Sequence, residues 1–187
     1  MSDPNTKLGK LLAWVLRHEP EAIGVELDLA GWIDVDELLA GLERYGRPTT
    51  RAQLEQCVAT DSKQRYTLSP EGTRIRAAQG HSIPVELGLE QREPPAQLFH
   101  GTPERFVATI LAEGLIRGQR HDVHLSTSTE TATQVGQRRG RPVILRIDAA
   151  AMHRDGHAFY CSDNGVWLTR AVLPAYLSLA HEPDPGQ

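Results

Sequence analysis

The hydrophobic residues near the beginning of the chain recur at the spacing of an amphipathic helix. The apolar positions are Leu8, Leu11, Leu12, Val15 and Leu16. Residues spaced by three and four positions lie on one face of a helix, so this pattern predicts a helix with a buried leucine-rich face. Pro20 disfavours helical backbone at the residue before it, so we expect the helix to end shortly after His18.

Two further helices are predicted, because each hydrophobic run follows a start signal. Asp34 with Glu37 forms a capping-box pair ahead of a leucine-rich run. Gly46 stands where a helix C-terminus favours glycine. Thr50 with Gln53 opens a third, short helix.

A β-hairpin is predicted after these helices. Two short runs, 65–68 and 73–77, flank the sequence Ser-Pro-Glu-Gly at 69–72, which is typical of a hairpin with a longer loop. Three helices followed by a hairpin are typical of a winged helix, which is related to the helix-turn-helix class. We therefore expect a winged-helix lobe over residues 1–82.

The second half of the chain has a different pattern. Residues 83–96 hold three prolines and no clear period, which predicts a linker or a strand leading to one. Over residues 97–187 short strands are mixed with two short helices, so the expected fold class is α+β with a mixed β lobe at the C-terminal end. The expected strands are 98–100, 122–126, 143–147, 158–161 and 166–173, and the helices are about 103–112 and 129–138. Phe106, Val107, Ile110 and Leu111 are expected to be core positions.

One predicted strand has a polar face. Alternation along a strand puts Arg120, Asp122, His124 and Ser126 on one face and His121, Val123 and Leu125 on the other. A cation, an imidazole and a hydroxyl in a row are poor core material, because buried polar groups need partners. This face is a candidate lining for a site that holds an anion. A turn at 163–165 then opens into an apolar strand and brings backbone donors close to a ligand.

The composition excludes few classes of protein. The chain has 187 residues, 20 basic and 24 acidic, with a net charge of -4, so no global signal indicates nucleic-acid binding, although a local basic cluster would still steer an anionic ligand. Cys57 and Cys161 are far apart in the sequence and suggest no disulfide framework. No signal peptide and no run of about 18 apolar residues is present. We expect a cytoplasmic protein without a membrane partner.

The common cofactor and metal motifs are absent. The sequence has no GxGxxG after a strand, no P-loop and no HExxH. His121 and His124 have metal-like spacing, but on a strand their rings point to opposite faces. His153 and His157 flank an Arg-Asp-Gly sequence, and surface histidines are the simpler explanation. We expect no metal site.

Several short polar runs each have a simple structural explanation. Arg17 and His18 end the first helix, where cations complement the helix dipole. Arg74 and Arg76 share a strand face opposite Ile75. The runs 63–65, 79–82 and 100–102 are explained separately as solvated charges or turns.

Together these runs resemble the RNA 2′-phosphotransferase family, the NAD-dependent tRNA 2′-phosphotransferases. The resemblance extends from Leu8 to about Leu177. The matching motifs are Leu16-Arg17-His18 with a following proline, Asp61-x-Lys63-x-Arg65-Tyr66, Ile75-Arg76-Ala77-x-Gln79-Gly80-His81-Ser82, His100-Gly101-Thr102, Arg120-His121-x-Val123-His124-Leu125-Ser126 and Asn164-Gly165-Val166-Trp167-Leu168-Thr169. Each is short, but their order and spacing together are specific.

The resemblance implies an RNA-binding winged-helix lobe and an NAD-binding lobe with the ADP-ribosyltransferase fold. It implies a metal-free, two-step reaction in which NAD is consumed. An internal RNA 2′-phosphate attacks the anomeric carbon of the nicotinamide ribose and expels nicotinamide. The 2″-hydroxyl then attacks phosphorus, giving RNA 2′-OH and ADP-ribose 1″,2″-cyclic phosphate. The expected partner is a tRNA-like RNA, in tRNA splicing or RNA repair, and the expected state is a monomer.

The resemblance also implies roles for individual residues. The expected catalytic residues are Arg17, His18, Arg65 and Arg120. The residues expected to bind RNA are Lys63, Arg76, Gln79 and His81, with Lys63 also assisting Arg120. The residues expected to bind NAD are His100, Gly101, Thr102, His124, Ser126, Asn164, Gly165 and Val166. Guanidinium groups suit a phosphate dianion, which needs positioning more than activation.

Two other functions remain open. One is an ADP-ribosyltransferase that caps a terminal phosphate of RNA or DNA and stops after the first step. The other is a winged-helix nucleic-acid-binding protein with an inert second lobe. Val166 stands where toxin-type ADP-ribosyltransferases place a catalytic glutamate, which argues against a protein-modifying toxin. Asp122 is expected either to orient Arg120 or to weaken its hold on phosphate.

Overall fold

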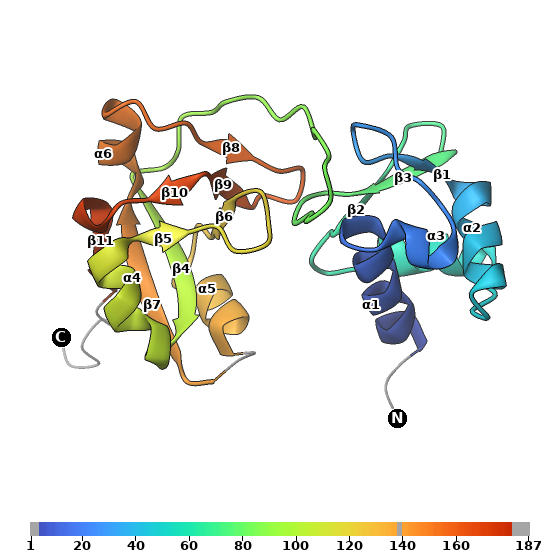
Figure 1. Ribbon diagram of the computed structural model, residues 1–187, viewed down its shortest axis with the longest axis horizontal. Helices are drawn as coiled ribbons and strands as arrows, with labels where there is room; N and C mark the ends of the chain where they lie inside the picture. Colours follow the sequence, from blue (N-terminus) through green and yellow to red (C-terminus); the bar gives the residue numbers. More distant parts are fainter. Residues whose placement is uncertain (1–3, 138–139, 181–187) are drawn as a thin grey trace. The chain divides into compact units, whose positions relative to one another are not determined.

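The structure is a computed structural model that describes residues 4–137 and 140–180 (Figure 1). The chain divides into two units, Met1–Leu89 and Glu90–Gln187. Each unit combines helices with small antiparallel sheets and has its own apolar core, so the chain is α+β as expected. Within the described ranges, no helix has the length and apolar character needed to cross a membrane.

Three helices make up much of the first unit, and cap residues begin two of them. The helices are α1 (Pro4–Arg17), α2 (Val35–Arg44) and α3 (Arg51–Ala59). The Asp34 side chain accepts hydrogen bonds from the backbone N–H groups of Asp36 at 2.8 Å and Glu37 at 3.2 Å. Thr50 and Gln53 form a complete capping box, each side chain accepting from the other's backbone N–H. These helix starts are predictable because the cap satisfies N–H groups that have no partner inside the helix.

A three-stranded antiparallel sheet completes the first unit. Its strands are β1 (Ile33–Asp34), β2 (Tyr66–Leu68) and β3 (Arg74–Ala77), in the order β1-β3-β2. β2 and β3 are the arms of the predicted hairpin, with Tyr66 opposite Ala77. β1 was not predicted, because two residues carry no detectable alternation and its partner Ile75 is distant in sequence. A 3-10 helix, η1 (Pro20–Ile23), follows α1.

The core of the first unit joins all three helices to the sheet. Leu12 and Leu16 of α1, Leu38 of α2, Leu54 of α3 and Ile75 of β3 are all fully buried. The leucine-rich face predicted for the first helix is therefore confirmed. Burial of this helix face places the C-terminal end of α1 against the β2–β3 hairpin. The polar runs 63–65 and 79–82 lie at the same end of the hairpin.

The second unit contains two three-stranded sheets and a two-stranded pair. The first sheet has the order β11-β7-β4, with β4 (Gln97–Pro103), β7 (Pro142–Asp148) and β11 (Leu177–Leu179). The second has the order β6-β9-β8, with β6 (Val123–Leu125), β8 (Tyr160–Cys161) and β9 (Trp167–Thr169). β5 (Leu115–Ile116) pairs with β10 (Ala171–Val172). An antiparallel bridge between Phe99 and Ser126 joins β4 to the end of β6.

Short helices connect these strands. They are η2 (Glu104–Phe106), α4 (Val107–Glu113), α5 (Thr129–Gly136), α6 (Ala149–Arg154) and η4 (Pro174–Tyr176). α5 packs against β4 and β7, while α6 and α4 each contact η4. The buried side chains of this unit include Leu98, Ile147, Met152 and Phe159.

The structure corrects several predictions for this half of the chain. The strand expected at 122–126 is regular only at Val123–Leu125, and residues 119–122 form a bend. The run 166–173 is two strands, because the chain leaves the β6-β9-β8 sheet at Arg170 and then pairs with β5. Phe106 is not a core residue: it is 45% exposed, with the Arg105 guanidinium over its ring. Val107, Ile110 and Leu111, also expected in the core, are only partly buried. β5, α6 and β11 were not predicted.

The segment expected to be a linker, 83–96, has no regular strand or helix apart from one isolated bridge at Gln91. Its first part is held by the first unit, where the Glu86 N–H donates to the Leu29 carbonyl at 2.6 Å. Its last part is held by the second unit, where the Arg92 N–H donates to the Phe159 carbonyl at 2.8 Å. The division between the units falls at Leu89–Glu90, inside this segment.

Candidate active site

The end of α1 and the segment after β3 come together in the first unit. The Ser82 N–H donates to the Arg17 carbonyl at 2.9 Å, and the Ser82 hydroxyl lies 2.8 Å from the His18 ring nitrogen Nδ1. Gly80 has a φ of +92°, and a Cβ there would lie 3.6 Å from the Arg17 guanidinium carbon. Arg17 and His81 are buried, at 8% and 2% exposure. Four of the predicted site residues, 17, 18, 79 and 81, thus belong to two segments in direct contact.

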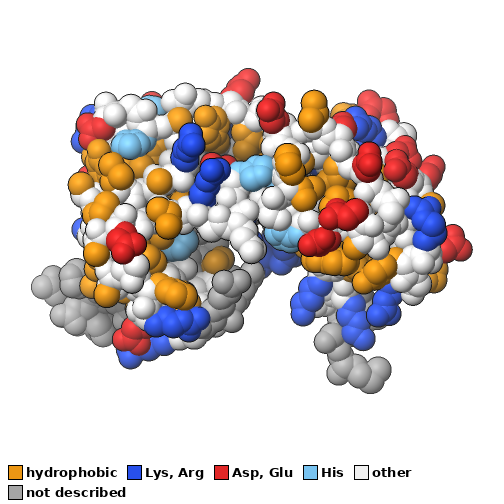
Figure 2. All heavy atoms as spheres, viewed as in Figure 1, with side chains coloured by type: hydrophobic (Ala, Val, Ile, Leu, Met, Phe, Trp, Pro, Cys, Tyr) orange, Lys and Arg blue, Asp and Glu red, His pale blue; other side chains and the backbone are white. Residues whose placement is uncertain are grey.

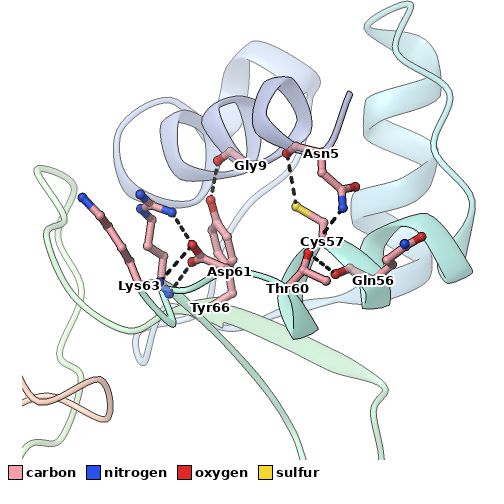
Figure 3. A network of polar contacts seen from close by, with 9 residues as sticks. Asn5, Gly9, Gln56, Cys57, Thr60, Asp61, Lys63 and Tyr66 are labelled. Carbon is pink, nitrogen blue, oxygen red and sulfur yellow. Dashed lines mark hydrogen bonds and ion pairs between the residues drawn. The ribbon is translucent and has the colours of Figure 1, made fainter. Parts of the chain in front are cut away.

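The loop between α3 and β2 brings a third segment to this place. The Ala78 N–H donates to the Arg65 carbonyl at 2.8 Å, so Arg65 lies directly across the hairpin from the start of segment 79–82. The Arg65 guanidinium is paired with the carboxylate of Asp61, which is only 8% exposed (Figure 3). Lys63 is exposed and lies between them in sequence. The hairpin register therefore explains why these charges lie near the 79–82 segment.

Tyr66 connects β2 to α1 and lies near charged side chains. Its hydroxyl donates to the Gly9 carbonyl of α1. Burial raises the pKa of the Tyr66 phenol well above its usual range, and the positive charges of Arg17 and Arg65 act in the opposite direction. The nearby Asp61 carboxylate acts in the same direction as burial and raises this pKa. Arg17 beside Gly80 and Arg65 opposite Ala78 form a small cationic site of the first unit around the beginning of β2.

Arg76, which is also predicted to bind RNA, has structural contacts of its own. The Arg76 guanidinium lies over the Trp32 ring, 4.7 Å from its centroid, and donates to the Leu87 carbonyl at 3.4 Å. Arg74 shares the sheet face with Arg76, as predicted, and pairs with Asp28 at 2.5 Å. The Gln79 Oε1 atom is buried and makes no hydrogen bond within the described part of the chain. The role of Arg76 in RNA binding stays a prediction.

The second group of site residues lies where the two sheets of the second unit meet. Phe99 and Ser126 exchange two backbone hydrogen bonds of 2.8 Å, and His100 is the next residue on β4. The His100 Nδ1 atom donates to the His124 carbonyl at 3.0 Å, because a carbonyl can only accept. Burial lowers the pKa of His100, so its ring is neutral with Nε2 unprotonated. His124 is fixed in a similar way, with Nδ1 donating to the Asp122 carbonyl at 3.0 Å.

Gly101 is required for packing inside the second unit. A Cβ at this position would lie 1.8 Å from the Ala132 carbonyl oxygen of α5. Such a distance is impossible, so α5 can lie against β4 only because residue 101 has no side chain. Thr102, the next residue, is 4% exposed. The packing of α5 on β4 is thus one reason for glycine at this position. The role of Gly101 in NAD binding stays a prediction.

A second turn is ordered by a buried serine. Ser162 lies 2.7 Å from Asn164 through its hydroxyl, which also accepts from the Val166 N–H at 3.2 Å. Gly165 has a φ of +75° and open space around it. The predicted turn at 163–165 is therefore present and leads into β9. Ser162 was not identified from the sequence, and its only signal was its position just before the turn.

Arg120 lies outside the regular strand that was expected to present it. It is exposed and belongs to the bend before β6, so strand alternation does not place it on the face of His124 and Ser126. Burial raises the pKa of the neighbouring Asp122 carboxyl, and the positive charges acting on it are those of His121, Arg117 and Arg170. The expected shared face of Arg120 and Asp122 is thus corrected, because the strand begins only at Val123.

The distribution of charged side chains and that of potential metal ligands give two further observations. On the face drawn in Figure 2, both units carry acidic as well as basic side chains. Among the residues that the structure describes, no group of three or more His, Cys, Asp or Glu side chains is placed to hold a metal ion.

Comparison with known proteins identifies the family. The model of the RNA 2′-phosphotransferase, Tpt1 / KptA family matches residues 3–171. The chain belongs to this family. A probable RNA 2′-phosphotransferase of Streptomyces coelicolor is 54% identical over 171 residues, covering 91% of this chain and 93% of that protein. Another, of Agrobacterium fabrum, is 53% identical over 176 residues, covering 94% and 95%. A third, of Nostoc punctiforme, is 49% identical over 178 residues, covering 95% and 98%.

Membership of the RNA 2′-phosphotransferase family confirms the resemblance stated for the sequence. The family match contains every predicted site residue, since these extend from 17 to 166. The individual roles stay predictions. Asp61 and Tyr66 stood in one of the matching motifs without a role, and only the structure shows that Asp61 is a buried partner of Arg65.

Proposed function

We propose that this protein removes an internal 2′-phosphate from RNA by transferring it to NAD. The phosphate oxygen bonds to the anomeric carbon as nicotinamide leaves, giving RNA-2′-phospho-ADP-ribose. The 2″-hydroxyl then attacks phosphorus, and the products are RNA with a 2′-hydroxyl and ADP-ribose 1″,2″-cyclic phosphate. The observation that carries the proposal is the cationic site of the first unit, where Arg17 lies against Gly80 and Arg65 lies across the hairpin from Ala78. Membership of the family supports the same substrate class.

The first unit is proposed to be a winged helix that holds the RNA. Its order of helices, with a hairpin as the wing and β1 as the third strand, supports this assignment. Arg17 and Arg65 would hold the 2′-phosphate through charge-assisted hydrogen bonds, which are shorter and stronger than neutral ones. His18 follows Arg17 in the chain, and His81 belongs to the segment 79–82 that contacts the end of α1. Both would donate to the same phosphate or to the neighbouring sugar.

The second unit is proposed to be an ADP-ribosyltransferase-like lobe that binds NAD. NAD supplies the electrophilic carbon and the adjacent hydroxyl. The residues around the β4–β6 bridge are chemically suited to it, because they offer neutral imidazole and hydroxyl groups. The unprotonated Nε2 of His100 would accept a hydrogen bond from a ribose hydroxyl or an amide, and burial keeps this ring neutral by lowering its pKa. Ser126 and the turn at 164–166 would contribute further donors.

Arg120 is proposed to act in the second step. Negative charge increases on the phosphoryl oxygens as the 2″-hydroxyl attacks, and a guanidinium stabilises that charge. Lys63 is exposed and is proposed to assist. Arg120 is exposed, so its side chain is accessible to a substrate.

The test is incubation of the purified protein with NAD and a short RNA that carries one internal 2′-phosphate, without added metal. Loss of the phosphate from RNA with formation of ADP-ribose cyclic phosphate is the expected result. The same RNA without the 2′-phosphate is the control and should leave NAD intact. Transfer of ADP-ribose to a terminal phosphate, with the internal phosphate retained, would replace this proposal by the capping activity.

A further inference from the structure

The loop from Asp61 to Arg65 is organised by one buried carboxylate. The Asp61 side chain is 8% exposed, whereas that of Arg65 is 30% exposed. Asp61 accepts hydrogen bonds from the Arg65 guanidinium, from the Arg65 N–H at 2.7 Å and from the Lys63 N–H at 3.3 Å (Figure 3). One side chain therefore fixes both the main chain of the loop and the direction of the arginine.

Both ends of this loop are attached to the first half of α1. Before the loop, the Asn5 side-chain amide donates to the Thr60 hydroxyl at 3.3 Å, and Thr60 donates to the Gln56 carbonyl at 2.7 Å. After the loop, the Tyr66 hydroxyl donates to the Gly9 carbonyl. Because α1 ends at Arg17, these contacts fix the loop relative to the helix that carries the other phosphate-binding arginine.

The loop adopts a conformation that an unconstrained chain would avoid. Gln64 has a φ of +43°, and no other non-glycine residue in the described ranges has a positive φ. Left-handed backbone is unfavourable for a residue with a Cβ, and it persists where surrounding contacts require it. Here the Gln64 N–H donates to the Asp61 carbonyl at 2.8 Å and closes the turn. Such a turn presents residues 63 and 65 in one defined arrangement.

We propose that Asp61 is a positioning residue, whose carboxylate orients Arg65 and the main chain of Lys63 to receive the RNA 2′-phosphate. This inference rests on the proposed function. Asp61 does not itself need to touch the substrate. It holds one Arg65 nitrogen, Nη1, and leaves the remaining donors of the guanidinium for phosphate. Fixing a flexible arginine before binding lowers the entropy lost on binding, which strengthens the complex.

A second effect of Asp61 has the opposite sign, and this makes the inference testable. A carboxylate beside Arg65 also repels a phosphate dianion. If repulsion dominated, removal of the charge would tighten RNA binding. If positioning dominates, as proposed, removal weakens it. Asp61 also accepts two hydrogen bonds from main-chain N–H groups of the loop. These bonds favour positioning, since a purely electrostatic role would not need them.

The test compares Asp61→Asn with the wild type in steady-state assays with 2′-phosphorylated RNA and NAD. Asparagine keeps one acceptor oxygen for a loop N–H group in place of the two oxygens that Asp61 uses, and it has no charge to hold the guanidinium. We expect the KM for RNA to rise on the order of 10-fold, with the KM for NAD changed less than 2-fold. Asp36→Asn is the matched control, because Asp36 pairs with Arg51 at 3.2 Å on the surface of the same unit. This control should change neither KM.

A double-mutant cycle separates positioning from general stability. On an Arg65→Ala background, Asp61→Asn should have a smaller further effect than in the wild type, because Arg65 is gone and only the main chain of Lys63 is left for it to position. An equal loss on both backgrounds, or a lower KM for RNA, would overturn the proposal. Asp61→Glu, which keeps the charge but displaces the guanidinium, should give an intermediate KM and serves if the asparagine variant does not fold. A wild type that leaves the 2′-phosphate in place would overturn the proposed function, and the positioning role with it.

Discussion

The two groups of site residues are built in different ways. In the first unit, cationic side chains are held by a buried carboxylate and by hydrogen bonds from neighbouring turns, as with Arg65 and Asp61. In the second unit, neutral imidazoles and hydroxyls are held by strand pairing and close packing, as with His100 and Gly101. A site for a dianion depends on charge and its orientation, whereas a site for a dinucleotide depends on shape. Substitutions that change charge and those that change volume should therefore have different consequences in the two units.

The largest expected effect is the loss of Arg65 from the first unit. Arg65→Ala removes a guanidinium from the proposed phosphate site, and loss of one such group from a reacting centre costs on the order of 10³-fold. We expect this fall in kcat/KM for 2′-phosphorylated RNA, with NAD binding unchanged. Arg47→Ala is the control, since Arg47 is an exposed side chain of the same unit. Equal activity of the two variants would remove Arg65 from the site.

The second-largest expected effect concerns Arg120 and the second step of the proposed reaction. Arg120→Ala should slow the attack on phosphorus on the order of 10²-fold, because charge on the phosphoryl oxygens is less stabilised. RNA carrying ADP-ribose through its 2′-phosphate should then accumulate, and gel electrophoresis with labelled RNA would detect it. Arg154→Ala, which changes an exposed arginine of α6, is the control. Normal turnover without accumulation would contradict the role given to Arg120.

The third substitution tests the packing of the second unit. Gly101→Ala would place a Cβ 1.8 Å from the Ala132 carbonyl oxygen, so α5 must move away from β4. Overpacking of this kind should reduce the free energy of unfolding by about 2 to 3 kcal/mol. Gly118→Ala is the control, because nothing lies within 4 Å of that position. Urea unfolding followed by Trp167 fluorescence, with Trp14 and Trp32 changed to Phe, reports on this unit alone, and equal midpoints would refute the packing argument.

The sequence predicted the elements whose signals are local. Thr50 and Gln53 lie three residues apart and define a helix start by themselves. The β2–β3 hairpin needs only two short runs and the turn between them. By contrast, β1 and β11 exist because of partners far along the chain, Ile75 for β1 and β7 for β11. α6, with three alanines in six residues, has no apolar spacing to mark it.

The resemblance to the family suggested which residues belong to the site, but it could not predict the geometry of the site. Motif matching selected Arg17, Arg65 and His100, but it contains no information on distance or burial. The reason for Gly101 depends on α5, which packs on β4 from a later part of the chain. The part that Asp61 plays depends on its burial, which only the folded unit provides.

The fourth prediction concerns the attachment of the loop in the first unit. Tyr66→Phe removes the hydroxyl that donates to the Gly9 carbonyl and keeps the buried ring. A single hydrogen bond of this kind contributes about 1 kcal/mol, so the free energy of unfolding should fall by about that amount. Tyr45→Phe, at an exposed tyrosine, is the control. Identical denaturation curves for Tyr66→Phe and the wild type would show that the Gly9 contact contributes nothing.

The smallest effect should appear as a pH dependence confined to the second unit. Burial lowers the pKa of His100 below its unfolded value of 6.5. Below pH 6.5 the unfolded chain binds a proton at His100 more readily than the folded unit does. The contribution of the neutral ring to the free energy of unfolding is therefore fully present above pH 6.5, and it is lost as the pH falls through the folded pKa. His100→Asn cannot titrate, so its unfolding midpoint, read from Trp167, should depend less on pH between 7.5 and 5. The same slope in both proteins would mean that His100 accepts a proton in the folded unit as easily as in the unfolded chain. The neutral ring proposed for the NAD site would then lose its physical basis.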